Sequence, residues 1–387
     1  MQVHLGGCGY AFPFEVTVPG VYRVLALATR TDWRSLNESI AGYPPLTRDD
    51  LLGERALIEL GSGVGEADSE AARVAVRAAA GLLVCDTDAL LRGRWVRAST
   101  VVGMFSERAP WFWSRWWIDR DPPNGLGARY WTDLSRDLFW TPYVCAAPLL
   151  DAGAARAFLA GKRMNFRGDS QLRLVYNHLM RVVCGSTEAA SKDQKLTDDV
   201  VANAPDCPGL IASFTHDMMG EQPYSLEPAA EPASLLVVNF GQHHASGRAR
   251  APLLVYEADL ERYWTAAAAE TAAKAPRSGA AGADFRAIWV DTFPMCVRND
   301  DFVWGYGDWR TPLRIHAYNA AARRVVGPHA SGGGPLDAYV GVYELLRQIC
   351  DVCPDGAHFI DVFPVLDFLV ALLMQHLGGA GLLLPTQ

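Results

Sequence analysis

Residues 163–183, RMNFRGDSQLRLVYNHLMRVV, join a strand-like pattern to a helix-like pattern at a Gly-Asp-Ser turn. The residues before the turn predict a short strand. The residues after it place apolar side chains at 172, 175, 179, 182 and 183, which is the spacing of a helix with one buried side. A strand, a turn and a helix in this order form the repeating unit of an α/β sheet.

The same alternation continues on both sides of this stretch. Residues 150–161 read as a helix, whereas 234–240 (SLLVVNF) and 286–294 (RAIWVDTFP) are continuous apolar runs typical of buried parallel strands. Two Ala/Gly-rich segments, 265–285 and 327–339, are predicted to be mobile or inserted loops. The apolar segment 368–385 reads as a final core helix plus a tail. Together these patterns predict a parallel sheet covered by helices on both faces.

The first 90 residues differ from the rest of the chain. Residues 14–29 alternate apolar and polar positions around a Pro-Gly pair, which predicts a half-buried hairpin. We therefore expect a small β-rich domain over residues 1–90 and a larger domain over 91–387. The larger domain contains a Trp-rich segment at 93–145. Trp111, Trp113, Trp116 and Trp117 in that segment either line a sugar-binding surface or pack the seam between the domains.

Composition and charge narrow the classes of partner. The 387 residues carry a formal charge of −8, so the chain has no broad basic field for nucleic acid. Eight cysteines fit either a few disulfide bonds in a lumenal protein or buried thiols. Cys350 and Cys353 form an isolated Cys-x-x-Cys, without the second pair that a zinc site needs. The first residues show no signal peptide, and we expect that the chain lacks its native start.

Three short motifs fall where predicted strands turn into helices. In Gly168-Asp169-Ser170, the serine is either a nucleophile supported by the helix start, or Asp169 or Ser170 is simply the helix N-cap. Asn239-Phe-Gly241 supplies either an oxyanion donor with a close-approach glycine or a common turn.

The third motif is Asp355-Gly-Ala-His358. Its carboxylate either orients the imidazole of His358 as a general base, or the motif is a turn followed by an unrelated histidine. The order Ser, Asn, Asp-x-x-His within one α/β region favours the chemical interpretation of all three motifs. His178 on the helix after Ser170 is expected to be a core residue, and Arg310 a structural partner of Asp308 near the site.

The sequences GDSQLR, LLVVNFGQHH and PDGAHF, in this order, resemble the signature blocks of the PC-esterase or trichome-birefringence-like branch of the GDSL/SGNH hydrolase superfamily. CDTDALLRGRWV upstream is similar to that family's Cys-Asp and Gly-x-Trp-Val pattern. DWRTPLRIHAYNAAARRVV is similar to the sialate O-acetyltransferase and neurexophilin-with-esterase-domain relatives. The resemblance spans residues 85–387, and the segment before it resembles the sandwich domain found in some of these relatives.

The resemblance implies a three-layer α/β/α fold of the SGNH type with a Ser-His-Asp triad. Ser170 would be the nucleophile, His358 the base and Asp355 its orienting carboxylate. The Ser170 N–H, Asn239 and Gly241 would support the oxyanion. Other site positions expected on this basis are Gly168, Asp169 and Arg173, the last either orienting the active-site loop or forming a salt bridge within the fold. No metal or organic cofactor is required.

Two blocks depart from the plant members of the family. Their Asp-Cys-Ser-His block with a Trp-Cys continuation is here Asp-Gly-Ala-His-Phe, and their Gly-His-Trp-Trp block is Gly-Gln-His-His. These differences argue against the plant cell-wall substrates.

The expected function is serine-dependent acyl transfer, with O-acetylation of a glycan hydroxyl through an acyl-serine intermediate. The partners would be an acetyl donor and a carbohydrate acceptor, in the Golgi lumen or after secretion. Any membrane association would come from a segment absent from this chain. The alternatives are a carbohydrate acetylesterase with the same triad, a non-catalytic glycan-binding protein on a degenerate esterase fold, and a cytosolic lipid or small-ester hydrolase.

Overall fold

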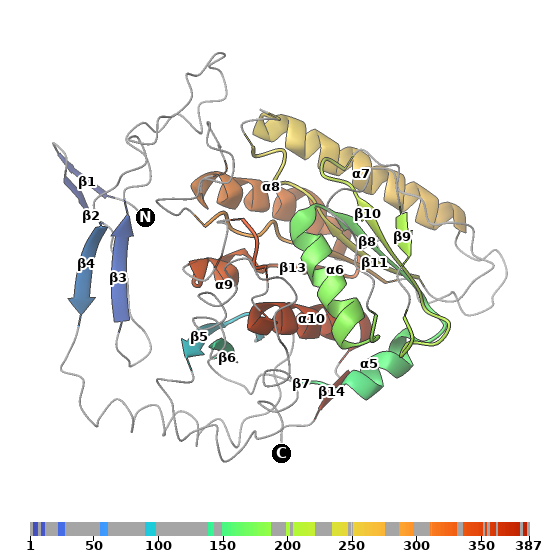
Figure 1. Cartoon of the computed structure of the whole chain (residues 1–387). Helices are drawn as coiled ribbons and strands as arrows, with labels where there is room; N and C mark the ends of the chain where they lie inside the picture. The colour runs from blue at the N-terminus through green and yellow to red at the C-terminus, as the bar shows by residue number, and fades with distance from the viewer. Residues whose placement is uncertain are drawn as a thin grey trace.

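The computed structural model describes part of the chain, and Figure 1 shows how the described elements are arranged. The described residues are 3–6, 9–11, 22–27, 55–60, 90–97, 138–142, 149–186, 199–201, 204–220, 234–246, 249, 251–274, 286–296, 310, 312–330, 336–350, 353, 357–360, 363–379 and 382–384. All statements below concern these residues.

The strands described within residues 1–142 form short antiparallel pairs. β1 (Val3–Gly6) pairs with β2 (Gly9–Ala11), β3 (Tyr22–Leu27) with β4 (Arg55–Leu60), and β5 (Gly93–Arg97) with β6 (Leu138–Pro142). The described partner of β3 is thus β4, whereas residues 14–18 of the predicted hairpin lie outside the described residues. Trp111 to Trp117 also lie outside them. The β-rich domain over residues 1–90 stays a prediction.

A six-stranded sheet forms the centre of the larger region, in the order β13-β12-β11-β8-β10-β9. Five strands run parallel, and β9 pairs antiparallel with β10 at one edge. Their bounds are β8 Arg163–Gly168, β9 Asp199–Val201, β10 Ile211–His216, β11 Ser234–Asn239, β12 Arg286–Val290 and β13 Ala338–Val340. The predicted α/β class with a parallel sheet is confirmed, as are strands beginning at 234 and 286, although β12 ends at Val290 and so covers only the first part of the predicted 286–294 run.

Helices cover both faces of this sheet (Figure 1). Leu235 and Val237 of β11 point into one apolar core, and Leu236 and Val238 point into a second core on the opposite face. The first core includes α5 (Ala152–Leu159), α6 (Ser170–Val182) and α10 (Phe363–Gly378). The second includes α7 (Leu253–Lys274) and α8 (Pro312–Ala330), while α9 (Tyr343–Arg347) contributes to both. Burial on both faces explains why β11 is an uninterrupted apolar run.

Two predicted loops are wrong over part of their length. Residues 265–274 continue α7, and residues 327–330 form the last turn of α8, whereas 338–339 already belong to β13. The stretch 265–274 contains no glycine or proline and is rich in alanine, the best helix former, so the helix continues. Ala267 is fully buried, because its small side chain fits against the second core.

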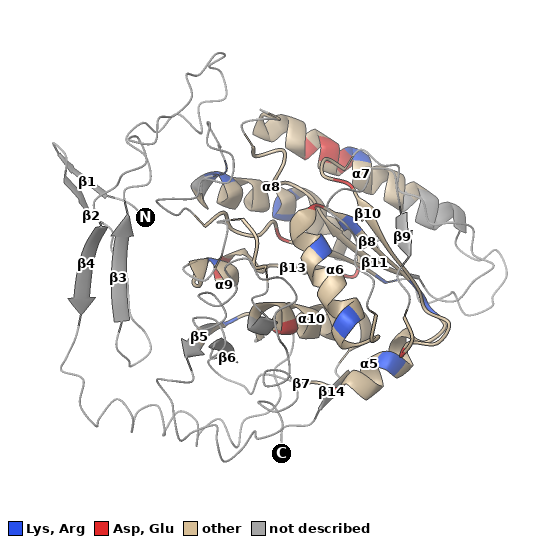
Figure 2. Ribbon diagram, viewed as in Figure 1, with Lys and Arg blue, Asp and Glu red and all other residues tan. Residues whose placement is uncertain are grey.

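The predicted C-terminal core helix is confirmed as α10. Its central apolar residues, such as Val365, Leu369 and Leu372, are buried in the first core. Among the helices that the structure describes, none combines the length and hydrophobicity that a membrane crossing requires. In Figure 2 the ribbon marks basic and acidic residues on several of the described helices, with both kinds present on α7.

Two disulfide bonds connect the described elements. Cys184, after α6, is bonded to Cys207, which precedes β10, and Cys296, after β12, is bonded to Cys350, after α9. Cys353 is buried and takes part in neither of these two bonds. Of the two options that the sequence left open, disulfide bonds are therefore present among the described cysteines.

Candidate active site

The carboxyl ends of three neighbouring parallel strands meet at one edge of the sheet. Gly168, the last residue of β8, is in register with His216 at the end of β10 and with Asn239 at the end of β11. Reactive groups in open α/β sheets gather at this edge, where strands turn into helices. The Gly-Asp-Ser and Asn-Phe-Gly motifs, predicted separately, therefore lie on adjacent strands.

Two glycines allow the backbones to approach closely at this edge. A Cβ atom on Gly168 would lie 2.3 Å from the carbonyl oxygen of Asn239, so no larger residue fits while β8 and β11 stay paired. Gly241 has a φ of 146°, and a Cβ there would lie 2.6 Å from Thr292 Oγ1. The predicted close-approach role of Gly241 is thereby supported, and Gly168 has the same role. Neither residue offers a side chain for substrate binding.

Asp169 is the N-cap of α6, and Ser170 is the first residue of the helix. The Asp169 carboxylate accepts a hydrogen bond of 2.8 Å from the backbone N–H of Gln171 and is fully buried. The suggestion that Ser170 caps the helix is wrong, because Asp169 does so. A carboxylate that caps a helix cannot donate to an oxyanion, so Asp169 positions the turn instead of contributing to oxyanion binding. The Ser170 hydroxyl is left for other contacts.

The Ser170 hydroxyl meets the imidazole of His358. Ser170 Oγ lies 2.6 Å from His358 Nε2, and both side chains are only partly buried. The two residues are 188 positions apart in the sequence, so the fold alone brings them together. Nucleophile and base within hydrogen-bond distance is the geometry that activates a serine. Asp355, the predicted orienting carboxylate, lies outside the described residues.

Asn239 has a different role from the predicted one. Its side-chain Nδ2 donates to the carbonyl oxygens of Val290 and Asp291, at 2.9 and 2.8 Å, and the residue is fully buried. Both amide hydrogens are thus engaged in joining β11 to the end of β12. In this geometry the Asn239 side chain ties two strand ends together and has no hydrogen left for an oxyanion.

Three further polar side chains lie close to Ser170 and His358. Burial lowers the pKa of His243 to about 3, and electrostatic repulsion from Arg310, and from His216 and His358 in their protonated forms, acts in the same direction, so the His243 imidazole is neutral. Arg310 is buried and also acts electrostatically on Asp169. The sequence patterns assigned no role at the site to His243, which lies in the LLVVNFGQHH block, or to His216. Their position at or just after the end of a parallel strand was the signal that could have identified them.

The other predicted polar residues have structural partners. His244 is buried, with Nε2 3.0 Å from Asp259 of α7. His178 is buried with Nε2 2.5 Å from Asp367 of α10, which confirms its predicted place in the core. Arg173 lies on the first turn of α6, where its backbone N–H donates to the Asp169 carbonyl oxygen. The role of its side chain stays a prediction.

No protein-family model and no curated protein matches this chain. The site must therefore be interpreted from its own geometry. Among the described residues, no group of three or more His, Cys, Asp or Glu side chains is placed to hold a metal ion.

The buried Asp169 carboxyl has a consequence for stability. Burial raises its pKa from 3.8 to about 6, although hydrogen bonds from the backbone of Gln171 and Leu172 and the charge of His358 act in the opposite direction. The folded state thus holds this proton more tightly than the unfolded chain does, so its contribution to stability is present below pH 3.8 and is lost as the pH rises through 6. At 1.36 kcal/mol per pH unit, the loss is about 3 kcal/mol.

We expect Asp169→Asn to remove this dependence, because asparagine also caps helices and carries no charge. The free energy of unfolding, measured by urea denaturation between pH 4 and 8, should rise in the variant relative to the native protein by about 2.5 kcal/mol across this range, since part of the effect lies below pH 4. Because the pKa of His243 is low, the free energy of unfolding also falls as the pH drops below 6.5. This effect is the same in the native protein and in Asp169→Asn, so it cancels when the two are compared. A difference that stays constant with pH would contradict the assignment.

Proposed function

We propose that this protein is a serine acyltransferase that moves an acyl group, with acetyl as the expected one, from a donor to a carbohydrate hydroxyl. The single observation that carries the proposal is the 2.6 Å contact between Ser170 Oγ and His358 Nε2 at the carboxyl edge of a parallel sheet. The proposal includes an SGNH-type fold and a place in the PC-esterase branch, which rest on the ordered sequence blocks.

The reaction proceeds in two half-reactions. His358 Nε2 takes the proton of the Ser170 hydroxyl while Oγ attacks the acyl carbonyl carbon. The tetrahedral intermediate collapses, the bond to the donor's leaving group breaks, and the imidazolium returns the proton to that group. The acceptor hydroxyl then attacks the acyl-serine. His358 takes the proton of this hydroxyl and passes it to Ser170 Oγ as the acyl–Oγ bond breaks, so the free serine hydroxyl is regenerated with the acceptor's proton.

Backbone N–H groups supply the oxyanion support in this proposal. The cap formed by Asp169 uses the N–H groups of Gln171 and Leu172 and not that of Ser170. The Ser170 N–H stands at the positive end of the α6 dipole, beside its own reactive oxygen. Gly241 is the second candidate donor. Because Asn239 is engaged with the end of β12, the backbone replaces its side chain in this role.

The proposed mechanism also requires one tautomer of the His358 imidazole. His358 can accept a proton on Nε2 only if Nδ1 carries one, and Asp355, three residues earlier, is the proposed acceptor for that N–H.

The bonds Cys184–Cys207 and Cys296–Cys350 support a location in the secretory pathway, since disulfide bonds persist in oxidising compartments. They disfavour the cytosolic hydrolase alternative.

A fluorophosphonate probe and an acyl-transfer assay test the proposal together. Purified protein is incubated with an activated acetyl ester, with and without an oligosaccharide acceptor, and the products are analysed by mass spectrometry. We expect acetylated oligosaccharide, together with covalent labelling of Ser170 by the probe. Donor consumption that is unaffected by the sugar, with no acetylated product, would replace the transferase by an esterase. The absence of both labelling and donor consumption would leave the glycan-binding alternative.

A further inference from the structure

The side chain of Gln171 connects the nucleophile helix to the loop that carries His358. It is fully buried on the first turn of α6, directly after Ser170. Its Nε2 donates a hydrogen bond of 2.9 Å to the carbonyl oxygen of Ala357, and its Oε1 accepts one of 3.1 Å from the backbone N–H of Phe293. One amide group thus uses both its donor and its acceptor on two different loops.

Both contacts lie next to the reacting atoms. Gln171 directly follows Ser170, and Ala357 directly precedes His358. The hydrogen bond between Gln171 and Ala357 therefore joins the residue after the nucleophile to the residue before the base. We propose that Gln171 is a positioning residue that fixes the distance between Ser170 Oγ and His358 Nε2. The inference rests on the proposed serine chemistry and adds to it the element that holds the two groups together.

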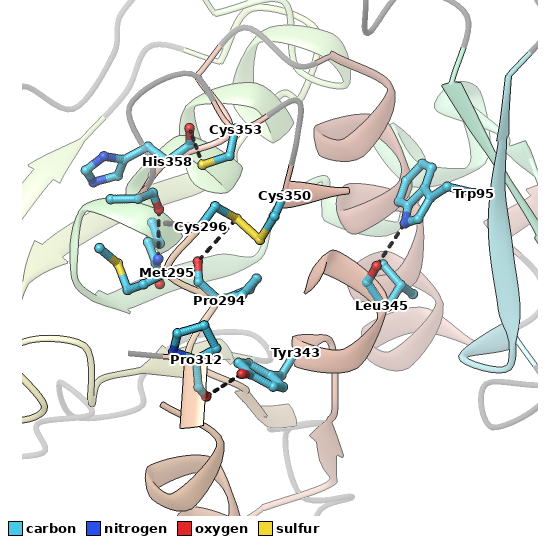
Figure 3. The surroundings of a disulfide bond; sticks show 12 residues. Trp95, Pro294, Met295, Cys296, Pro312, Tyr343, Leu345, Cys350, Cys353 and His358 are labelled. Atoms are coloured by element: carbon cyan, nitrogen blue, oxygen red, sulfur yellow. Dashed lines mark hydrogen bonds between the residues drawn. A yellow bond between two sulfur atoms is a disulfide. The ribbon is translucent and has the colours of Figure 1, made fainter. Parts of the chain in front are cut away.

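A disulfide bond to another segment and one contact within the loop also hold the loop before His358, and both are visible in Figure 3. The Cys296–Cys350 bond joins it to the segment after β12, and the Cys353 thiol lies 3.4 Å from the carbonyl oxygen of His358. Phe293, which donates to Gln171, belongs to that same segment after β12. Gln171 therefore joins α6 to a unit of two loops that the disulfide bond already holds together.

The chemistry of the two contacts identifies the substitutions that test them. Methionine fills a similar volume but neither donates to Ala357 nor accepts from Phe293. Glutamate accepts from Phe293 but, when ionised, places a negative charge against the Ala357 carbonyl oxygen. When protonated, glutamate donates as glutamine does. Burial raises the pKa of such a carboxyl, so it takes up its proton at a moderately acidic pH.

The experiment compares Gln171→Met and Gln171→Glu with the native protein and with Val175→Ala in the acyl-transfer and fluorophosphonate assays. Val175 lies one turn further along α6, is buried in the first core and has no polar side-chain atom, so its truncation loosens the helix without removing a hydrogen bond to either loop. We expect Gln171→Met to lower kcat and the labelling rate by about 10- to 100-fold with KM unchanged, as displacement of a catalytic group does. Val175→Ala should retain native kcat at a temperature where it is folded.

The pH profile separates positioning from general destabilisation. The ratio of Gln171→Glu activity to native activity should rise as the pH falls from 8 to 6, because the protonated side chain restores the hydrogen bond to Ala357. The corresponding ratio for Gln171→Met should stay low throughout, and thermal unfolding at each pH excludes loss of folded protein as the cause.

The outcomes distinguish this inference from the proposed function. If the native protein is labelled at Ser170 and turns over donor, while Gln171→Met keeps native kcat, the positioning role is overturned and the serine chemistry stands. An equal loss in Gln171→Met and Val175→Ala also overturns it. If the native protein is neither labelled nor active, the proposed function fails instead.

Discussion

Ser170→Ala and His358→Ala should each lower the acyl-transfer rate by about 10⁴-fold or more, and the double variant should be no slower than the slower single variant. The physical reason is that neither group works alone. The serine is a weak nucleophile until Nε2, 2.6 Å away, takes its proton, and the imidazole can protonate the leaving group only after it has taken that proton. Single-turnover kinetics with an activated acetyl ester measures all three variants.

A matched control comes from a histidine that lies on the nucleophile helix but outside the site. His178 lies on α6 and is engaged with Asp367 of α10 and with Arg181, so His178→Gln should change stability and leave kcat close to native. If the losses for Ser170→Ala and His358→Ala multiply in the double variant, the two residues act independently. That result would exclude the nucleophile-base pair even if each residue matters.

The sequence predicts those helices and strands whose apolar residues recur at a regular spacing and are buried in the folded protein. The strand of 163–168, the helix from 170 and the apolar runs of β11 and β12 could be predicted, because each buries its apolar residues at a regular spacing. The stretch 265–274 was misassigned as a loop because alanine lacks the apolar periodicity that marks a helix, although its helix propensity is the highest.

At the candidate site, the residue types were predictable but several of their roles were not. The pairing of Ser170 with His358 was anticipated from the order of motifs and is reproduced by the geometry. The engagement of Asn239 with Val290 and Asp291 depends on how the end of β12 meets β11, which a single sequence does not encode locally. Gln171 could not be singled out for the same reason, since its partners lie more than a hundred residues away.

Loss of the Cys296–Cys350 bond should affect stability and catalysis together. The bond closes a loop with a sequence separation of 54, and by the chain-entropy estimate its removal costs about 4 kcal/mol in the free energy of unfolding. It also ends eight residues before His358 and anchors the unit of two loops that Gln171 contacts. We therefore expect Cys296→Ser/Cys350→Ser to lower kcat by about tenfold or more at a temperature where the variant is folded.

The second bond provides the comparison within the same chain. Cys184–Cys207 joins the end of α6 to the segment before β10, at the opposite end of α6 from Ser170, with a sequence separation of 23. Its removal in Cys184→Ser/Cys207→Ser should cost about 3 kcal/mol and leave kcat near native. Urea denaturation measures the two stability losses, and steady-state kinetics measures the activities. Because the stability losses are similar, a selective loss of kcat in the Cys296 and Cys350 variant can only come from the position of the His358 loop. Equal losses of kcat in both variants would show that the loss does not come from the position of the His358 loop.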